Sequence, residues 1–319
     1  MTSLFERKPD TSVLDLPLIA EFSAFNDLLR GWVPAGDGTT GGANTRDGLR
    51  LAVRHNYLNF YLAGQSVARV KFGQRPKGLK LIVHDKYVRG ELGQGQKEMR
   101  FVTGTASDTP AIVADWIVNA RKWCKGEKTF VDEVISHNIN VIDVEMAMPG
   151  LTNKKGKRIA PRMDIVALEP HGAGWQLVFW EAKLIGNGET RAKKGDPRVL
   201  EQLKTYRTWL CAHQEEVIGA YRKTCEVLVD LHKRATAAGE AVGKLGAGII
   251  AVVDEKTELV LDPQVRLLVD ARSGTRKIEE NDHLSKLKAK TTVHLVRTGA
   301  DLILPVGTAT AAAIALVTA

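Results

Sequence analysis

The spacing of apolar residues changes from helical to alternating along the first part of the chain. Residues 11–33 carry apolar side chains at helical intervals, which predicts a helix, and the Gly-rich stretch 34–48 predicts a turn-rich loop. Residues 54–62 then alternate with period two, and Tyr57 and Tyr61 fall on the more polar face. Alternation of this kind is typical of a half-buried antiparallel strand.

The first 105 residues are expected to form an α+β module. Residues 65–72 and 79–88 continue the alternation, so we predict a meander of antiparallel strands beside the first helix. From Thr109 the period becomes helical again, behind Asp108-Thr109-Pro110, which is a favourable start for a helix. We therefore place a second domain over residues 106–319.

The second domain has its own order of expected elements. A short helix fits residues 128–137, and a long helical stretch covers 197–237 with a break near Gly219. The expected strands are residues 140–148, 161–169, 175–184 and the glycine-flanked apolar run 247–253. The order is thus helix, three strands, helix, strand, and the fold class is α/β.

Composition and charge narrow the class of protein. Hydrophobic residues make up 44% and charged residues 26% of the 319 residues, as in ordinary globular domains. The formal net charge of +8 favours polyanionic partners, because lysine and arginine displace counterions from phosphate backbones. Cys124, Cys211 and Cys225 form no CxxC pair, and the first residues lack a signal-peptide pattern. We expect free thiols, a cytoplasmic protein, and no membrane span even in the apolar stretch from Leu302.

Three polar residues interrupt two otherwise apolar strands. Asp164 lies in Met163-Asp164-Ile165-Val166, and Glu181 and Lys183 lie in Trp180-Glu181-Ala182-Lys183. Residues two apart on a strand point to the same face, so Glu181 and Lys183 share one face. An antiparallel neighbour can bring Asp164 within several ångströms of Glu181. Two carboxylates form an oxygen shell that suits Mg²⁺, and the lysine would orient or deprotonate a water or offset charge on a phosphate.

This Asp…Glu-x-Lys pattern across a hairpin resembles the PD-(D/E)xK nuclease superfamily, and the resemblance covers about residues 125–255. The family's restriction-endonuclease-like core runs helix, three strands, helix, strand, as expected above. The residue before Asp164 is Met163 where the family has proline, although Pro161 lies close by. Gln202 and Tyr206 match the Gln-x-x-x-Tyr that RecB-like members carry on the following helix, and their spacing puts both on one helix face.

Many members of this family also place a glutamate on the first core helix. Glu133 fits this position best, since Phe130 and Val134 would anchor the adjoining apolar stripe, while Asp132 and Glu145 are alternatives. The resemblance implies a Mg²⁺- or Mn²⁺-dependent nuclease that leaves a 5′-phosphate, with a setting in restriction, defence against foreign DNA, or repair. Asp164 and Glu181, completed by Glu133, would ligate the metal, and Gln202 and Tyr206 would position the substrate or Lys183.

Basic residues flank the expected site on two loops and are candidates for contacts to nucleic acid, with DNA favoured over RNA. They are Lys154, Lys155, Lys157, Arg158, Arg191, Lys193 and Lys194.

Two rival interpretations remain open. One is a catalytically silent nucleic-acid-binding protein, and the other is a protein-interaction scaffold whose N-terminal sheet is the working part, with Tyr57 and Tyr61 stacking on bases or on a partner. For the nuclease, the resemblance implies that a homodimer or a partner protein can be needed to cut both strands.

Overall fold

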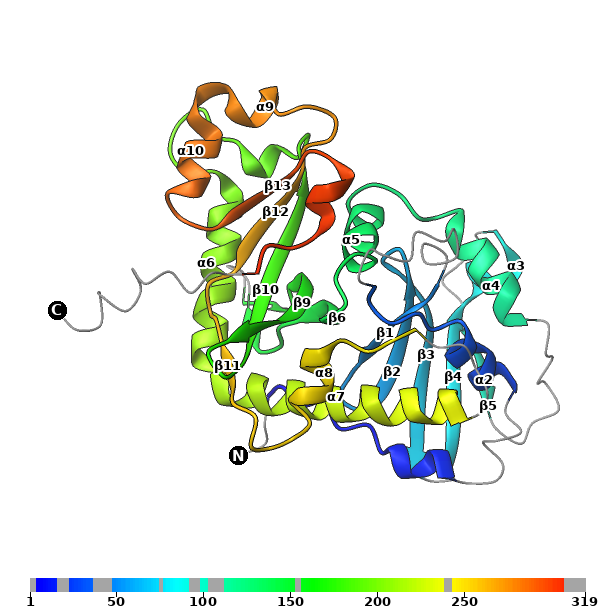
Figure 1. Cartoon of the computed structure of the whole chain (residues 1–319). Helices are drawn as coiled ribbons and strands as arrows, with labels where there is room; N and C mark the ends of the chain where they lie inside the picture. Colours follow the sequence, from blue (N-terminus) through cyan, green and yellow to red (C-terminus); the bar gives the residue numbers. More distant parts are fainter. Residues whose placement is uncertain are drawn as a thin grey trace.

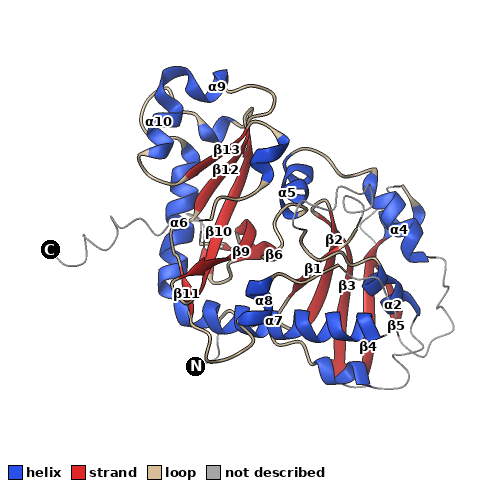
Figure 2. Cartoon of the chain, in the orientation of Figure 1, coloured by secondary structure: helices blue, strands red, loops and turns tan. Residues whose placement is uncertain are grey.

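The computed structural model describes residues 4–15, 23–36, 48–74, 77–91, 98–102, 112–152, 156–237 and 243–306. Within these residues the chain forms two main sheets that lie beside each other, with helices packed around them (Figure 1). Helices and strands both contribute to each half of the molecule (Figure 2). The expected α/β class is confirmed at this level.

The N-terminal sheet is a five-stranded antiparallel meander whose strands follow chain order. The strands are β1 (Arg50–Val53), β2 (Tyr57–Leu62), β3 (Gln65–Gln74), β4 (Lys77–His84) and β5 (Glu98–Val102). The helix expected over residues 11–33 is represented by a 3-10 turn, η1 (Thr11–Asp15), and by α2 (Ser23–Arg30), while residues 16–22 lie outside the described residues.

The strand expected over residues 79–88 is wrong in its second half, where the chain forms α3 (Asp85–Arg89). The His84 ring Nδ1 accepts a hydrogen bond from the backbone N–H of Lys86 at 3.1 Å, which caps the helix. Gly90 ends the helix at φ +78°, a left-handed conformation that glycine adopts without strain. The alternation of residues 79–84 therefore stops at a side-chain cap.

The second sheet has the order β13-β12-β10-β9-β6, and β11 also pairs with β10. Strands β6 (Val141–Ala147), β9 (Arg162–His171) and β10 (Gly174–Leu184) are antiparallel, as expected from the sequence. Strand β12 (Arg266–Asp270) is parallel to β10, and β13 (Val293–Val296) is parallel to β12. The remaining strands are β7 (Leu151–Thr152), β8 (Arg158–Ile159) and β11 (Leu259–Leu261).

The main helices of this half are α5 (Glu127–Ile135), α6 (Arg198–Ala212) and α7 (Gln214–Ala237). The break in the long helical stretch falls at His213, so the prediction of a break near Gly219 is wrong. Gly219 lies inside α7, which continues through it. The shorter elements are η3 (Gly188–Thr190), α9 (Arg276–Glu279), η4 (Glu280–Asp282), α10 (His283–Lys288) and η5 (Gly299–Leu302).

Residues 247–251, expected as a buried strand, form the short helix α8 (Ala247–Ala251), so that prediction is wrong. A short apolar run has no periodicity that separates a buried strand from a buried helix. Tertiary contacts decide here: the Asn140 side chain accepts a hydrogen bond from Gly248 N at 3.1 Å, at the start of the helix. A Cβ at Gly248 would lie 2.7 Å from the Trp175 ring. The strands after the long helices that run parallel to β10 are instead β11 and β12.

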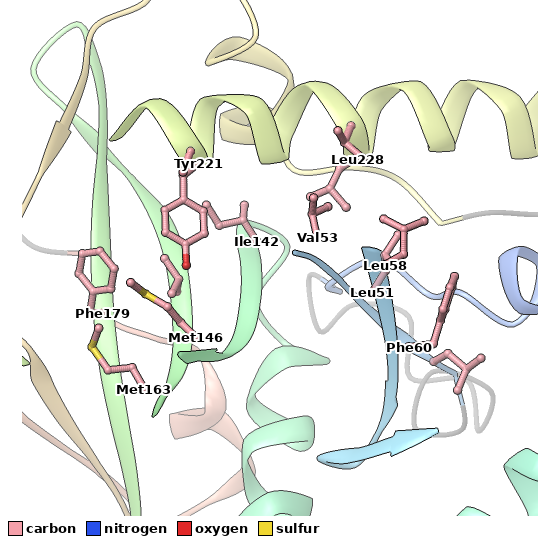
Figure 3. Close-up of a cluster of buried hydrophobic side chains, with 14 of the residues drawn as sticks. Leu51, Val53, Leu58, Phe60, Ile142, Met146, Met163, Phe179, Tyr221 and Leu228 are labelled. Atoms are coloured by element: carbon pink, nitrogen blue, oxygen red, sulfur yellow. The ribbon is translucent and has the colours of Figure 1, made fainter. Parts of the chain in front are cut away.

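One continuous hydrophobic core joins the two sheets (Figure 3). Helix α7 lies across it, with Tyr221 over the second sheet and Leu228 over the N-terminal sheet. Helix α4 (Ile112–Arg121), which follows the expected boundary at residue 105, packs against α2, α3 and strands β2 and β3 of the N-terminal half. The other labelled core residues are Leu51, Val53, Leu58, Phe60, Ile142, Met146, Met163 and Phe179.

A buried ionic cluster centred on Asp143 also joins the two halves. The Asp143 carboxylate accepts hydrogen bonds from Arg7 at 2.8 Å, from Arg54 at 2.5 Å and from the Tyr221 hydroxyl at 2.9 Å. These groups come from the start of the chain, the end of β1 and α7, while Asp143 lies on β6. Its side chain is fully buried, and removing one partner of a buried ion pair leaves an uncompensated charge.

Candidate active site

Strand β10 brings a carboxylate and an ammonium group into the protein interior. Glu181 and Lys183 are 2% and 5% exposed, and Lys183 Nζ donates a hydrogen bond of 2.5 Å to Glu181 Oε1. Gln202 Nε2 on α6 donates to the same oxygen at 2.8 Å. The second oxygen, Oε2, is buried and has no hydrogen-bond partner among the described residues. Buried carboxylate oxygens rarely stay unpartnered, so this atom is a candidate ligand for a cation.

Asp164 reaches this pair from the neighbouring strand. Pairing between β9 and β10 ends at Ile165 and Trp180. Beyond that point the backbone N–H of Ala182 donates to Asp164 Oδ2 at 2.8 Å. Ala182 lies between Glu181 and Lys183, so the Asp164 carboxylate is fixed beside both, as the sequence pattern predicts. The sheet thus places two carboxylates and one ammonium group at the end of the β9–β10 ladder.

Burial changes the proton affinity of all three groups. Burial, followed by the negative charge of Glu181, raises the pKa of Asp164 well above its usual range. Burial raises the pKa of Glu181 from its ordinary 4.5 to about 7, although Lys183 opposes this. Burial acts to lower the pKa of Lys183, but the nearby carboxylates outweigh it and the pKa is raised. Lys183 therefore carries its charge at neutral pH, which suits charge stabilisation better than proton abstraction.

These shifts predict a pH-dependent stability for the metal-free protein. Above pH 4.5 the unfolded chain ionises Glu181, whereas the folded chain keeps the proton until about pH 7. The folded state then binds more protons, so the free energy of unfolding falls as pH rises through this window. For a shift from 4.5 to about 7 the loss is about 3 kcal/mol, at about 1.4 kcal/mol per pKa unit.

Urea denaturation in EDTA between pH 5 and pH 8 measures this loss. Glu181→Gln should lower the slope and leave the part that the raised pKa of Asp164 contributes, whereas Glu226→Gln, at a partly exposed position of α7, should keep the wild-type slope. Equal slopes in wild type and Glu181→Gln would contradict the assigned environment.

Helix α6 presents Gln202 and Tyr206 to the site one turn apart. Gln202 Nε2 lies 2.5 Å from Tyr206 Oη, in addition to its bond to Glu181. The Tyr206 hydroxyl donates to the backbone carbonyl of Arg162 on β9 at 2.9 Å. Burial, aided by the charge of Glu181, raises the pKa of Tyr206, so it remains a neutral phenol. The two side chains expected from the Gln-x-x-x-Tyr pattern thus connect α6 to both strands of the site.

Glu133 lies outside this cluster. Its carboxylate pairs with Arg272 at 2.6 Å, and Arg272 also pairs with Asp270, the last residue of β12. The acid of α5 that approaches the cluster is Glu127, whose Oε1 lies 3.8 Å from Lys183 Nζ. Glu133 comes six positions after Glu127, which places the two about 120° apart around the helix axis.

The two alternatives to Glu133 also have other partners. Asp132 is buried against Arg50 at 3.0 Å, and burial raises its pKa. Glu145 pairs with Lys128 at 3.4 Å and Arg162 at 3.3 Å. Glu127 was missed because the helix was expected to begin at residue 128. Gly126, whose positive φ of +67° suits glycine, precedes the first helical residue and is the signal that marks it.

A cavity of about 190 Å³ opens beside the cluster, between α5, β9 and the N-terminal sheet. Glu127 and Asp164 lie in its wall on one side, and Arg50 and Tyr61 on the other. The cluster is therefore reached through a pocket to which both halves of the chain contribute.

The oxygen ligands that the cluster offers fit a divalent cation that also binds water molecules. Asp164 and Glu181 supply oxygen atoms of the kind Mg²⁺ and Mn²⁺ prefer, and the unpartnered Glu181 Oε2 is available to such an ion. In the part of the chain that the structure describes, no three His, Cys, Asp or Glu side chains are gathered as a ready-made metal cluster. Two carboxylates suffice for an ion that keeps several of its waters.

The basic residues expected to contact nucleic acid are only partly described. Lys154 and Lys155 lie outside the described residues, whereas Lys157 and Arg158 lie exposed at β8. Arg191 donates to the carbonyl of Gly186 at 3.1 Å. Lys193 and Lys194 are exposed after η3. Their contact with nucleic acid stays a prediction.

Comparisons of the chain with protein-family models, with curated proteins and with solved structures found no match. None of the helices described is at once long and apolar enough to cross a membrane. Function must therefore be argued from the site itself.

Proposed function

We propose that the chain is a metal-dependent nuclease of the restriction-endonuclease-like class that the PD-(D/E)xK pattern indicates. The observation that carries this proposal is the buried cluster of Asp164, Glu181 and Lys183, in which Glu181 Oε2 has no partner among the described residues. Burying charged groups costs free energy, and a purely structural ion pair does not explain why this cluster bears that cost. The net charge of +8 supports a polyanionic substrate.

Each residue of the cluster has a distinct task in this proposal. Asp164 and Glu181 would hold a divalent cation, which when bound supplies neutralisation of the phosphate charge and activation of a water molecule. The Lys183 ammonium group stabilises the negative charge that builds on the phosphate oxygens. Gln202 fixes the orientation of Glu181, and Tyr206 fixes Gln202 against β9. Glu127, in the wall of the pocket, lies near the Lys183 ammonium group and helps to hold it in place.

The reaction adds one water across a phosphodiester. The water oxygen bonds to phosphorus, the bond from phosphorus to the 3′ oxygen breaks, and that oxygen leaves with a proton. The family resemblance favours cleavage of this bond, which leaves a 5′-phosphate on one product and a 3′-hydroxyl on the other.

The test of the proposal is incubation of the purified chain with linear and circular DNA, single- and double-stranded, and with RNA. Cleavage is expected with Mg²⁺ or Mn²⁺ and not in EDTA. Because the new 5′ ends should carry a phosphate, they should accept a 5′ label only after phosphatase has removed it. Cleavage that persists in EDTA, or no cleavage of any of these substrates, would contradict the proposal.

The position of Glu127 yields a paired prediction. Glu127→Gln should lower the cleavage rate about tenfold to a hundredfold, because it removes a charge 3.8 Å from Lys183 Nζ. Glu133→Gln should change it less than threefold, since Glu133 pairs with Arg272 instead. Rates are compared at saturating metal. The opposite ranking of the two variants would restore Glu133 as the acid of the first helix.

A further inference from the structure

The face of the N-terminal sheet opposite the core lines a cavity and carries aromatic and basic side chains. On β2, Leu58 and Phe60 point into the hydrophobic core, so Tyr57, Asn59 and Tyr61 fall on the other face. A cavity of about 330 Å³ lies against them, within the range of about 300–1,000 Å³ of ligand pockets. We call it the sheet cavity.

The sheet cavity adjoins the pocket of the candidate active site. Tyr61, Glu145 and Arg162 line both. Arg162 is two residues before Asp164 on β9, and Lys128 follows Glu127 directly on α5. A chain-like ligand that occupies the sheet cavity would therefore lead directly to the carboxylates of the site.

Positive charge predominates around the sheet cavity. Besides Arg54, whose charge is neutralised by Asp143, three basic side chains line it, namely Arg69, Lys86 and Arg162, against two carboxylates, Glu98 and Glu145. Lys86 Nζ lies 4.7 Å from the Tyr87 ring centroid and 5.0 Å from that of Trp123. Burial, followed by the neighbouring charge of Lys128, lowers the pKa of Lys86.

Glu145 stands between the two cavities in an unusual conformation. Its φ is +53°, in the left-handed region that residues other than glycine seldom adopt. One carboxylate oxygen lies 3.4 Å from Lys128 Nζ and the other lies 3.3 Å from an Arg162 guanidinium nitrogen. Strained residues of this kind cluster at functional sites. The Glu145 carboxylate thus presents its two oxygens to a lysine and an arginine. The two oxygens of a phosphodiester can pair with the same two cations.

We propose that the sheet cavity and the active-site pocket together bind one single strand of nucleic acid, and this inference rests on the proposed function. A base packs against Tyr57, and an adjoining phosphate lies between Lys128 and Arg162, displacing the carboxylate of Glu145. Aromatic stacking combined with a basic track along the backbone is the usual way in which single strands are bound.

Single strands fit this cavity better than duplexes. Tyr57 is half-buried in the wall of the cavity, so it can meet only a base that is turned out of a stack. The bases of a duplex are covered by their neighbours, and duplex binding would use phosphate contacts on an open surface instead. DNA and RNA both carry the bases and phosphates that this binding requires. They differ in the sugar, so the comparison of the two in the binding test distinguishes them.

The test measures binding and not cleavage. Fluorescence anisotropy in EDTA compares a labelled single-stranded DNA, the same sequence as RNA, and the duplex, each with full-length protein. Tyr57→Ala and Arg162→Ala should each weaken single-strand binding about tenfold, while Tyr57→Phe retains it. Glu145→Gln should tighten binding about threefold, because the competing carboxylate is neutralised. Arg276→Ala, at an exposed arginine of α9, is the matched control and should not change it.

The outcomes separate this inference from the proposed nuclease activity. If the wild type cleaves nucleic acid but Tyr57→Ala and Arg162→Ala bind like wild type, the cavity assignment is wrong and the nuclease stands. If the binding pattern is as expected but no metal supports cleavage, the cavity stands and the nuclease fails. Preference for the duplex, or no binding by the wild type, would overturn the cavity assignment. Thermal melting of each variant establishes that it is folded.

Discussion

Replacing Lys183 with alanine is expected to lower metal-dependent cleavage by about a hundredfold to a thousandfold, the usual loss when one charge-stabilising donor is removed. The pKa of Lys183 is raised, so the variant loses a full positive charge beside Asp164 and Glu181. Its affinity for single-stranded nucleic acid should stay within threefold of wild type, since Lys183 lines neither the sheet cavity nor the pocket that adjoins it.

Initial rates under single-turnover conditions measure the effect on chemistry directly. Lys204→Ala, at an exposed position of α6, is the control and should cut at the wild-type rate. A Lys183→Ala protein that cuts within a few-fold of wild type would remove the lysine from the mechanism. Equal loss of binding and cleavage would instead indicate that the variant disturbs the whole pocket.

Replacing Asp143 with alanine is expected to lower the free energy of unfolding by about 3–5 kcal/mol. Asp143 is the common acceptor for Arg7, Arg54 and Tyr221, so its loss leaves two buried guanidinium groups uncompensated. Small proteins unfold with about 5–15 kcal/mol in total, so this single change removes a large part of the stability.

Urea denaturation at pH 7 measures this loss. Asp230→Ala is the matched control, because Asp230 forms a partly exposed pair with Arg234 on α7 and such pairs contribute about 0–1 kcal/mol. A loss below about 1 kcal/mol in Asp143→Ala would mean that the cluster relaxes or takes up water. It would also weaken the view that Asp143 joins the two halves of the molecule.

The strands that carry the site were predictable because their sequence pattern is strong. Asp164 and Glu181 interrupt apolar runs that are rich in β-branched and aromatic residues, and that composition favours a strand over a helix. The Gln202–Tyr206 pair was predictable for a similar reason, since a four-residue spacing places both side chains on one face of a helix. The sequence pattern was enough to predict these residues because the regular geometry of a strand or helix determines the direction of their side chains.

The errors arose where tertiary contacts decide. Residues 247–251 became a helix because Asn140 caps them and Trp175 packs against the Gly248 backbone, and neither contact is visible in the run itself. Glu127 was missed because the first residue of a helix is poorly defined by periodicity. Glu133 was preferred on the neighbouring apolar stripe, but its partner Arg272 comes from 139 residues further along the chain.

The sheet cavity shows how a site can be divided along the sequence. Tyr57 and Arg162 are more than a hundred residues apart, yet both line it. The alternation along β2 predicts which aromatic residues share a face, but it does not predict what lies opposite them. Only the packing of the N-terminal sheet against β6 brings the aromatic face to the carboxylates.

The central claim is that Asp164 and Glu181 hold a divalent cation. Calorimetric titration of Mn²⁺ into the metal-free protein at pH 8, above the pKa of about 7 for Glu181, tests it most directly. The account predicts binding by the wild type and affinity weakened at least a hundredfold in the Asp164→Asn/Glu181→Gln double variant. Equal binding by both proteins, or no binding by the wild type, would contradict the claim.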